Sequence, residues 1–244
     1  MRVAAQYVRS AWTLSWNAMS ELVKLNALAL GGGPVRGGGG PSGASGVAVP
    51  TGNTYDKYAS SNPIERKLMG GFFEALMGSL PDTAPEAILE VGVGEGEVSA
   101  KLRELYPDAT IVGIDLPDPE LEAHWRAKGL NGLCADIVQL PFPSKSFDLV
   151  MGIEVLEHVF DPPAALAELA RLSRSHVVLS VPREPIWRVA NMARGKYIGK
   201  LGNTPGHVQH WSKKGFAEMV GTQFDVVDVK SPFPWTMVAA RTRT

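Results

Sequence analysis

The sequence contains a single cysteine, Cys134, among its 244 residues. One thiol cannot form an intramolecular disulfide or supply a cysteine-rich zinc site, so neither can hold this fold together. Scarce cysteine is typical of proteins from a reducing compartment. We therefore predict a cytoplasmic protein in which Cys134 is a small core residue.

An excess of charge of one sign is also lacking, because 24 Lys and Arg residues stand against 25 Asp and Glu residues. Without an excess of cations, the chain has no global field that would hold a nucleic-acid backbone by counterion release. We therefore predict that nucleic acid is not a partner. Apolar residues make up 45% of the sequence, and the length suits one substantial domain with an extension.

The first 53 residues differ in composition from the rest, since they carry four basic residues and one acidic residue, Glu21. Apolar residues within 4–30 recur at helical spacing but are interrupted by polar ones. They predict an amphipathic helix that lacks the roughly 18 uninterrupted apolar residues of a membrane span. It could be a docked extension, a helix that rests on a membrane surface or partner, or a targeting peptide.

Residues 31–53 are rich in glycine, and ordering them would cost backbone entropy that few side chains could offset. We expect a linker there, which divides the chain into an N-terminal segment, 1–53, and a main domain, 54–244. Peripheral membrane contact through residues 1–30 remains one alternative for the first segment. The oligomeric state cannot be inferred from this pattern.

Beyond the linker, short β-rich runs alternate with segments of helical periodicity. A first helix is expected to begin after Asn62 as N-cap, with Pro63 and Glu65 in its first turn, and to reach about Leu80. The expected strands are 87–93, 110–116, 131–137, 147–155, 175–181, 224–231 and 235–241, and the further helices are 97–105, 119–128, 162–173 and 212–220.

Strands separated by helix-length segments require right-handed crossovers, so this alternation predicts an α/β fold with a mostly parallel sheet covered on both faces. The last two expected strands are separated only by a few residues around Pro232 and Pro234. That connection is too short for a crossover. We therefore expect these two strands to pair as an antiparallel hairpin at the end of the sheet.

A glycine-rich loop follows the first expected strand, with Gly92, Gly94 and Gly96 at alternate positions. Glycines allow a sharp turn and a close approach of backbone to ligand, although a purely structural turn would look the same. A dinucleotide fingerprint would need a third glycine at position 97, where Glu97 stands instead. A nicotinamide-dependent oxidoreductase is therefore the lesser alternative.

Carboxylates come at or just after the ends of the expected strands. Glu90 closes the first strand, and Asp115 closes the second at about the distance from the glycines where an acid binds a ribose diol. Asp136, with Ile137 behind it, is placed to accept a hydrogen bond from an adenine amino group. Each acid alone would fit a cap or a solvated loop charge, but together they favour a neutral or cationic cofactor.

In this order, the motifs resemble the class I S-adenosylmethionine-dependent methyltransferases, most closely the small-molecule branch that includes ubiquinone-biosynthesis O-methyltransferases. The resemblance spans about residues 55–242. It rests on residues 90–96, Asp115, residues 134–136, 140–143, 147–150 and 154–158. It implies a Rossmann-like, seven-stranded, mostly parallel sheet with an antiparallel C-terminal hairpin and helices on both faces.

The resemblance also implies how S-adenosylmethionine would be held. It assigns the methionine part of the cofactor to Glu90, Gly92, Gly94 and Gly96, the ribose to Asp115 and Leu116, and the adenine to Asp136 and Ile137.

Transfer to a hydroxyl is helped by a general base, and histidine titrates near neutral pH. Of the three histidines in motif-like positions, His158, His207 and His210, we select His158 and His210 as catalytic candidates. Glu154, Glu157 and His158 would share one face if this turn is helical. With His210 they could bind magnesium, manganese or zinc, but a structural role for His158 and an assembly without metal remain open.

Residues 182–212, a long insertion before the last expected helix, are where such folds build a cover over the acceptor. Trp187, Tyr197 and Trp211 are candidates to line an aromatic or lipidic pocket, and Ser212 is expected to cap the following helix. The sequence thus predicts methyl transfer from S-adenosylmethionine to a small, hydroxyl-bearing, partly apolar acceptor. An NAD(P)-dependent oxidoreductase or a catalytically silent cofactor-binding scaffold are the alternatives.

Deletion of residues 1–53 should leave a folded, cofactor-binding domain, because every motif lies beyond the glycine-rich linker. Thermal unfolding of the truncated chain should stay cooperative and shift upward when S-adenosylhomocysteine is added. The full-length chain is the control. Loss of cooperative unfolding on truncation would show that the N-terminal segment completes the core.

Overall fold

A computed structural model describes residues 62–243. The predicted amphipathic helix of residues 4–30 and the glycine-rich linker lie outside the described residues, and so does the boundary at residues 53 and 54. Within the described part, no helix is both long enough and apolar enough to span a bilayer.

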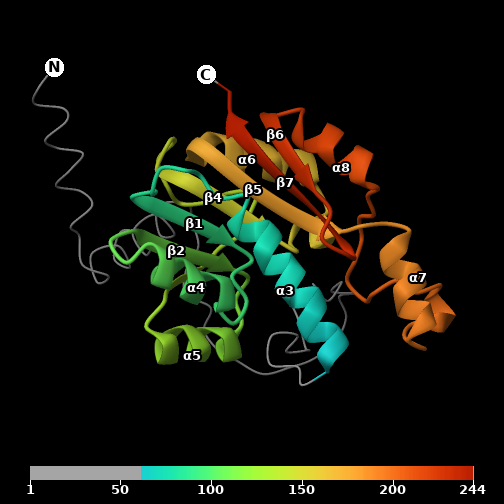
Figure 1. The fold of residues 1–244 in the computed structure, drawn as a ribbon. Coiled ribbons are helices and arrows are strands. Elements are labelled where there is room, and N and C mark those ends of the chain that lie inside the picture. Colours follow the sequence, from blue (N-terminus) through green and yellow to red (C-terminus); the bar gives the residue numbers. More distant parts are fainter. Residues whose placement is uncertain (1–61, 244) are drawn as a thin grey trace, which may run out of the picture. The chain divides into compact units, whose positions relative to one another are not determined.

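A seven-stranded sheet forms the centre of the described chain, with the strand order β3-β2-β1-β4-β5-β7-β6 (Figure 1). The five strands β3, β2, β1, β4 and β5 are parallel, and β7 lies antiparallel between β5 and β6. The strands are β1 Ala87–Val91, β2 Thr110–Asp115, β3 Asn131–Cys134, β4 Phe147–Ile153, β5 Ser173–Pro182, β6 Phe224–Lys230 and β7 Trp235–Thr242. The α/β fold and the C-terminal hairpin are confirmed.

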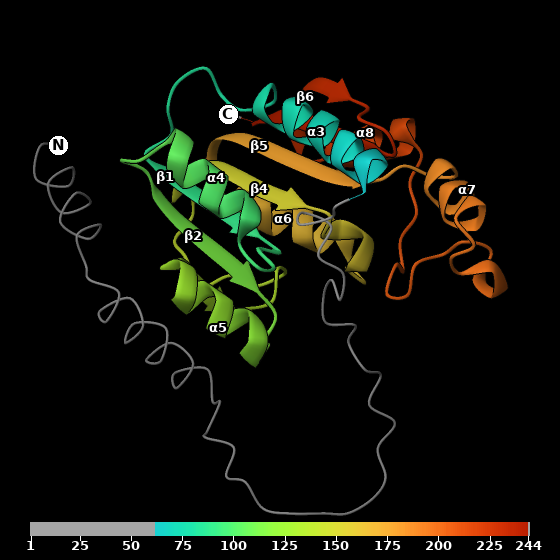
Figure 2. The same cartoon turned by 60° about the horizontal axis from the view of Figure 1, so that its bottom comes forward.

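Helices cover both faces of this sheet, with α3 and α4 on one face and α6 and α8 on the other (Figures 1 and 2). The α-helices are α3 Pro63–Met77, α4 Glu97–Leu105, α5 Pro119–Lys128, α6 Pro162–Leu172, α7 Ile186–Ala193 and α8 Lys213–Val220. Two short 3-10 helices are η1 Leu156–His158 and η2 Ile198–Lys200.

Caps set the helix boundaries as the sequence predicts. The Oδ1 atom of Asn62 accepts a hydrogen bond of 2.9 Å from the backbone N–H of Ile64, and Ser212 accepts one of 3.1 Å from Gly215 at the start of α8. Helix α3 ends at Met77 rather than near Leu80, because the N–H of Gly78 closes the last turn. Helices α4 and α5 have the predicted bounds.

Several strands end earlier than predicted at their carboxyl ends. β1 stops at Val91 and β4 at Ile153, and the residue that follows each has a positive φ, +70° at Gly92 and +59° at Glu154. A left-handed residue cannot continue an extended ladder, so the chain leaves the sheet there. Because the apolar residues continue past these points in the sequence, both strands were predicted to end two residues later than they do.

The largest difference from the sequence prediction lies in the insertion, which contains α7 and η2. No helix was predicted there, and Pro182 and Pro185 before the segment and glycines after it are residues typical of a loop. A second difference concerns Cys134, which is half-buried rather than in the core. It ends β3, and β3 is an edge strand with neighbours on one side only.

Packing of α3 against the C-terminal half of the sheet ties the first described helix to the last strand. The ring of Phe72 is 2% exposed and meets Trp235 of β7 edge to face, with ring centroids 5.0 Å apart. The side chain of Leu76 is fully buried in the same cluster. This packing holds β7 in place beside the carboxyl end of β5, which is where the insertion begins.

Candidate cofactor and acceptor site

The three loop glycines have different surroundings. A Cβ atom at Gly92 would lie 2.1 Å from Val155, and one at Gly96 would lie 2.0 Å from Leu130, so these two positions are needed for packing. At Gly94, whose φ is +51°, an added Cβ would have nothing within 4 Å among the described residues. Gly94 is thus the glycine that faces open space, as the backbone of a ligand cradle does.

Polar contacts hold Gly94 from both sides. Its N–H donates a 2.8 Å hydrogen bond to Oδ2 of Asp115, and its carbonyl accepts a 2.7 Å hydrogen bond from Nε1 of Trp125. The ammonium of Lys128 donates to the next carbonyl, that of Glu95, at 2.9 Å. The loop is therefore fixed by the end of β2 and by one face of α5. No sequence motif pointed to Trp125, which is the one buried residue of α5.

Asp115 ends β2 and receives two backbone hydrogen bonds of 2.8 Å, from Gly94 to Oδ2 and from Leu116 to Oδ1. Burial raises the pKa of Asp115, while these hydrogen bonds and the nearby His158 act in the opposite direction. A carboxylate has about four acceptor positions, so Asp115 can still accept hydroxyl groups.

Glu90 lies in the centre of the sheet rather than on the loop surface, with 2% of the residue exposed. The hydroxyl of Ser99 on α4 donates a short hydrogen bond to Oε2 of Glu90. Burial raises the pKa of Glu90 to about 8, which the hydrogen bond from Ser99 partly offsets. The side chain is therefore mostly protonated at neutral pH, and its contact with a cofactor stays a prediction.

The expected adenine residues follow β3. Asp136 is exposed and accepts a 3.1 Å hydrogen bond from the N–H of Val138, and Ile137 is 8% exposed. The carboxylate of Asp136 already orders its own loop, as an Asx turn does. An exposed acceptor beside a buried aliphatic side chain fits the predicted contact with an adenine ring, which also stays a prediction.

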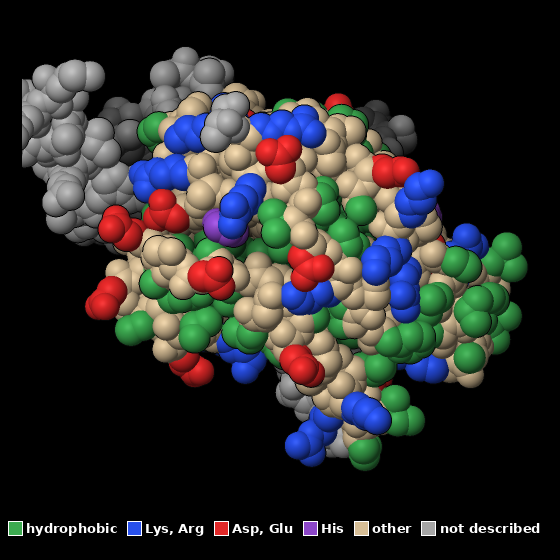
Figure 3. Space-filling view, turned by 45° about the horizontal axis from the view of Figure 1, so that its top comes forward, with side chains coloured by type: hydrophobic (Ala, Val, Ile, Leu, Met, Phe, Trp, Pro, Cys, Tyr) green, Lys and Arg blue, Asp and Glu red, His purple; other side chains and the backbone are tan. Residues whose placement is uncertain are grey.

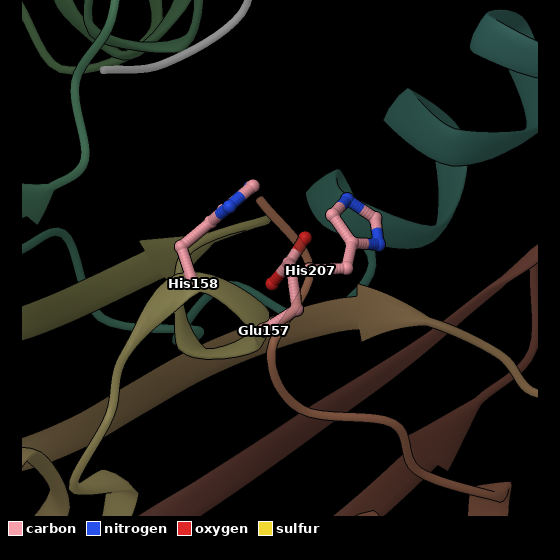
Figure 4. Close-up of side chains that lie close together, drawn as sticks. All are labelled: Glu157, His158 and His207. Carbon is pink, nitrogen blue, oxygen red and sulfur yellow. The ribbon is translucent and has the colours of Figure 1, made fainter. Parts of the chain in front are cut away.

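A second group of polar side chains gathers beyond β4, where η1 meets the insertion (Figure 4). Glu157, His158 and His207 each offer an atom able to bind a metal, and these atoms lie within 4.8 Å of one another. The rings of His158 and His207 meet edge to face with centroids 4.9 Å apart. We call these three residues the Glu-His-His cluster.

The insertion is fastened to η1 through its backbone. The N–H groups of Val208 and Gln209 donate to the carbonyl oxygen of Glu157 at 2.9 and 3.1 Å. In return, Nδ1 of His158 lies 3.0 Å from the carbonyl oxygen of Gly206. A carbonyl oxygen can only accept, so Nδ1 carries the proton in this bond and the neutral ring has its lone pair on Nε2.

The structure corrects two members of the predicted acidic and imidazole cluster. His210 is exposed, and its Nε2 lies 2.7 Å from Oδ1 of Asn203, outside the Glu-His-His cluster. Glu154 accepts hydrogen bonds from Nε1 of Trp235 at 2.6 Å and from Ser180 at 3.4 Å. The φ of +59° at Glu154 breaks the helical spacing on which the shared face depended.

His207 takes the place predicted for His210 because the turn of residues 203–207 folds back onto η1. Its ring is 9% exposed and stacks on Trp187 of α7, with centroids 6.1 Å apart and planes at 26°. Nε1 of Trp187 in turn donates to the hydroxyl of Thr204 at 2.9 Å. Of the three predicted lining aromatics, Trp187 reaches the cluster, while Trp211 packs on Phe216.

Both groups of residues lie at the carboxyl edge of the parallel strands. In the strand order, β1 has β2 on one side and β4 on the other, so the connections diverge between β1 and β4. Such a point is where α/β sheets bind ligands, and an acid after β2 with a glycine loop after β1 is typical of nucleoside-containing cofactors. The fold and the site are therefore those of an α/β protein that binds a nucleoside-containing cofactor.

Among proteins that bind nucleoside-containing cofactors, known proteins similar to this chain include methyltransferases. Residues 89–181 match a family model described as "Methyltransferase domain". Malonyl-[acyl-carrier protein] O-methyltransferase from Herminiimonas arsenicoxydans is 37% identical over 93 residues, which cover 38% of this chain and 35% of that protein. Demethylmenaquinone methyltransferase from Thermus thermophilus is 34% identical over 112 residues, which cover 43% and 51% respectively.

Among solved structures, a methyltransferase in complex with the Trm112 activator from Haloferax volcanii has a TM-score of 0.61 at 17% identity and covers 74% of this chain and 92% of that one. At this identity the likeness shows the fold alone. Over residues 89–181 the chain is similar to methyltransferases, in line with its resemblance to the class I S-adenosylmethionine-dependent enzymes. It spans between a third and a half of the length of the two curated relatives described above.

The substitution Glu90→Gln should change how stability depends on pH. Because the pKa of Glu90 is about 8 in the folded chain against an ordinary value of 4.5, the wild type binds an extra proton when folded. Its unfolding free energy should therefore fall, relative to that of Glu90→Gln, as pH rises from about 5 to about 8, by at most about 1.4 kcal/mol per pH unit.

Urea unfolding of both proteins across this pH range would measure the difference. Ser99→Ala, which removes only the donor to Glu90, is the matched control and should keep the pH dependence. Parallel stability curves for wild type and Glu90→Gln would contradict the prediction.

Proposed function

We propose that this chain transfers a methyl group from S-adenosylmethionine to a small, hydroxyl-bearing, partly apolar acceptor. The observation that supports this most directly is that Asp115, which ends β2, and the Glu-His-His cluster, which follows β4, both lie at the carboxyl edge of the parallel strands. Cofactor-side and acceptor-side residues thus share one edge of the sheet. When bound, the cofactor supplies an electrophilic methyl group on a sulfonium sulfur.

The residues present suit this cofactor. The open space over Gly94 leaves room for a ligand against the backbone, and Asp115 has acceptor positions for two ribose hydroxyls. The ammonium of Lys128 donates to the carbonyl of Glu95 next to Gly94 and is paired with the carboxylate of Glu97, while Asp115 adds a carboxylate at Gly94 itself. Two carboxylates against one ammonium suit a cationic sulfonium better than a pyrophosphate.

His158 is the base that the geometry supports. Its Nδ1–H is held by the carbonyl of Gly206, which fixes the orientation of the ring and makes Nε2 the basic atom of the neutral imidazole. An acceptor hydroxyl within reach of Nε2 would give its proton to His158, and the cofactor, when bound, would supply the methyl group and leave as its neutral thioether. The remaining catalysis comes from holding the two reacting atoms in line in a site that excludes water.

Glu157 and His207 complete the site in one of two ways. As neighbours of His158 they would stabilise the imidazolium that forms, or the three side chains together would bind a divalent metal that lowers the pKa of the acceptor hydroxyl. Two imidazoles and one carboxylate form a donor set for zinc, manganese or iron rather than for magnesium. Either assembly acts on a hydroxyl group, so the proposed acceptor is the same.

The rival functions have less support. For a nicotinamide-dependent oxidoreductase, a dinucleotide pyrophosphate would have to bind at the start of α4, where Glu97 carries a negative charge and pairs with Lys128. A silent scaffold would not need His158, Glu157 and His207 to converge. The cytoplasmic location and the absence of a nucleic-acid partner stay predictions.

Asp115→Asn should weaken binding of S-adenosylhomocysteine at least about tenfold, since charge-assisted hydrogen bonds to a carboxylate contribute about 1.5 to 3 kcal/mol. Isothermal titration calorimetry would measure the affinity. Asp148→Asn is the matched control, because Asp148 caps the opposite, amino edge of the sheet through Glu86 and Ala87. Equal affinities for wild type and Asp115→Asn would contradict the proposal that Asp115 binds the ribose hydroxyls.

His158→Ala should lower turnover by about 10² to 10⁴ at neutral pH, with partial recovery at high pH as a phenolic acceptor ionises unaided. Release of S-adenosylhomocysteine over a panel of phenolic acceptors is the measurement. His210→Ala should stay near wild type, because His210 lies outside the cluster. Cofactor affinity should be unchanged in both.

A chelator distinguishes the two versions of the Glu-His-His cluster. If a metal is required, chelation and His207→Ala should each abolish turnover, and zinc or manganese should restore it after chelation. If His158 acts as a base alone, chelation should have no effect. Full turnover in His158→Ala together with insensitivity to chelation would mean that transfer needs neither group.

A further inference from the structure

The insertion exposes apolar side chains that the sheet and the site do not use. In η2 and the residues beside it, Ile198 is 62% exposed and Leu201 is 67% exposed, and Val189 on α7 is 56% exposed. Met192 and Tyr197, at 37% and 40%, lie in the same segment. Figure 3 shows hydrophobic side chains gathered at this end of the described domain with Lys and Arg side chains beside them. We call residues 186–201 the insertion surface.

The charge of the insertion surface has one sign. It contains Arg188, Arg194, Lys196 and Lys200 and no Asp or Glu, although the whole chain is close to neutral. Arg194 lies 3.8 Å from Glu65, and Arg188 donates to the carbonyl of Leu201, so these two also serve the fold. Lys196 and Lys200 are exposed. Exposed aliphatic side chains are thus bordered by cations.

This surface is held in a fixed shape. Tyr197 and Leu201 have φ values of +55° and +50°, and the N–H of Gly202 donates to the carbonyl of Tyr197 at 2.9 Å. The side-chain amide of Asn191, 2% exposed, donates to the carbonyl of Gly202 and joins α7 to the turn. The exposed apolar groups are therefore presented by an ordered unit, which lowers the entropy cost of binding.

Helix α7 and the turn after it project away from the sheet in both ribbon views (Figures 1 and 2). A projecting surface with aliphatic side chains inside a border of Lys and Arg fits a flat, anionic, apolar layer better than a groove on a protein. The long stems of Lys196 and Lys200 can lie along the apolar layer while their ammonium groups reach phosphates.

We propose that the insertion surface docks on a lipid bilayer that contains anionic phospholipids, with Val189, Ile198 and Leu201 in the acyl boundary and Lys196 and Lys200 at the headgroups. This docking needs neither cofactor nor methyl transfer. It also differs from a contact through residues 1–30, because its residues belong to the described domain.

The test is flotation of the full-length chain with vesicles of phosphatidylcholine alone and of phosphatidylcholine mixed with phosphatidylglycerol. The chain should float with the mixed vesicles, far less with the neutral ones, and less as salt is raised. In Lys196→Gln/Lys200→Gln, affinity for the mixed vesicles should fall about thirtyfold, since each cation near an anionic surface contributes about fivefold.

A second variant, Ile198→Ser/Leu201→Asn, should lower the affinity at least about tenfold through lost apolar burial, and asparagine tolerates the positive φ at position 201. Matched controls are Val227→Ser, 59% exposed on β6, and Lys213→Gln/Lys214→Gln on α8, and both should bind as wild type does. Calorimetric binding of S-adenosylhomocysteine would show that every variant is folded.

Absence of flotation, equal flotation with neutral vesicles, or undiminished flotation of both insertion-surface variants would each overturn the proposal. The last result would assign lipid binding to another part of the chain. None of these outcomes bears on methyl transfer, which is measured separately.

Discussion

The hydrogen bond between the N–H of Gly94 and the carboxylate of Asp115 is the constraint on which the cofactor site depends. It joins the loop after β1 to the end of β2, and the indole of Trp125 fixes the carbonyl of the same glycine from α5. The loop is thereby held open over Gly94 instead of collapsing onto the sheet. Burial raises the pKa of Asp115, and the hydrogen bonds from Gly94 and Leu116 act in the opposite direction.

Much of the fold could be predicted from the sequence, because its elements carry local signals. Asn62 and Ser212 are N-cap residues, which mark the start of a helix in the sequence. Helices α4 and α5 have the predicted bounds. The short interval around Pro232 and Pro234 excluded a crossover and fixed the direction of the last strand. The cofactor-side positions followed from the rule that parallel strands deliver their carboxyl ends to one edge.

The acceptor side could not be predicted to the same degree, since it depends on contacts between segments about fifty residues apart. Whether His207 or His210 joins His158 is decided by residues 206–209, which bond to η1 through backbone groups that carry no sequence signal. The prediction that Glu154 shares a face with Glu157 and His158 was wrong for a local reason. Glu154 has a left-handed φ, which the spacing of acidic residues does not reveal. Helix α7 was not predicted, and prolines and glycines lie at its ends.

The two halves of the site have different origins in the chain. The glycine loop, Asp115 and Asp136 come from one stretch of β1 to β3, whereas Gly206 and His207 come from the insertion after β5, which is hydrogen-bonded to η1. Evolution could therefore exchange the insertion for one of another length or shape without disturbing the residues that hold the cofactor. The residues proposed to hold the cofactor and the segment proposed to select the acceptor are therefore separate parts of the chain.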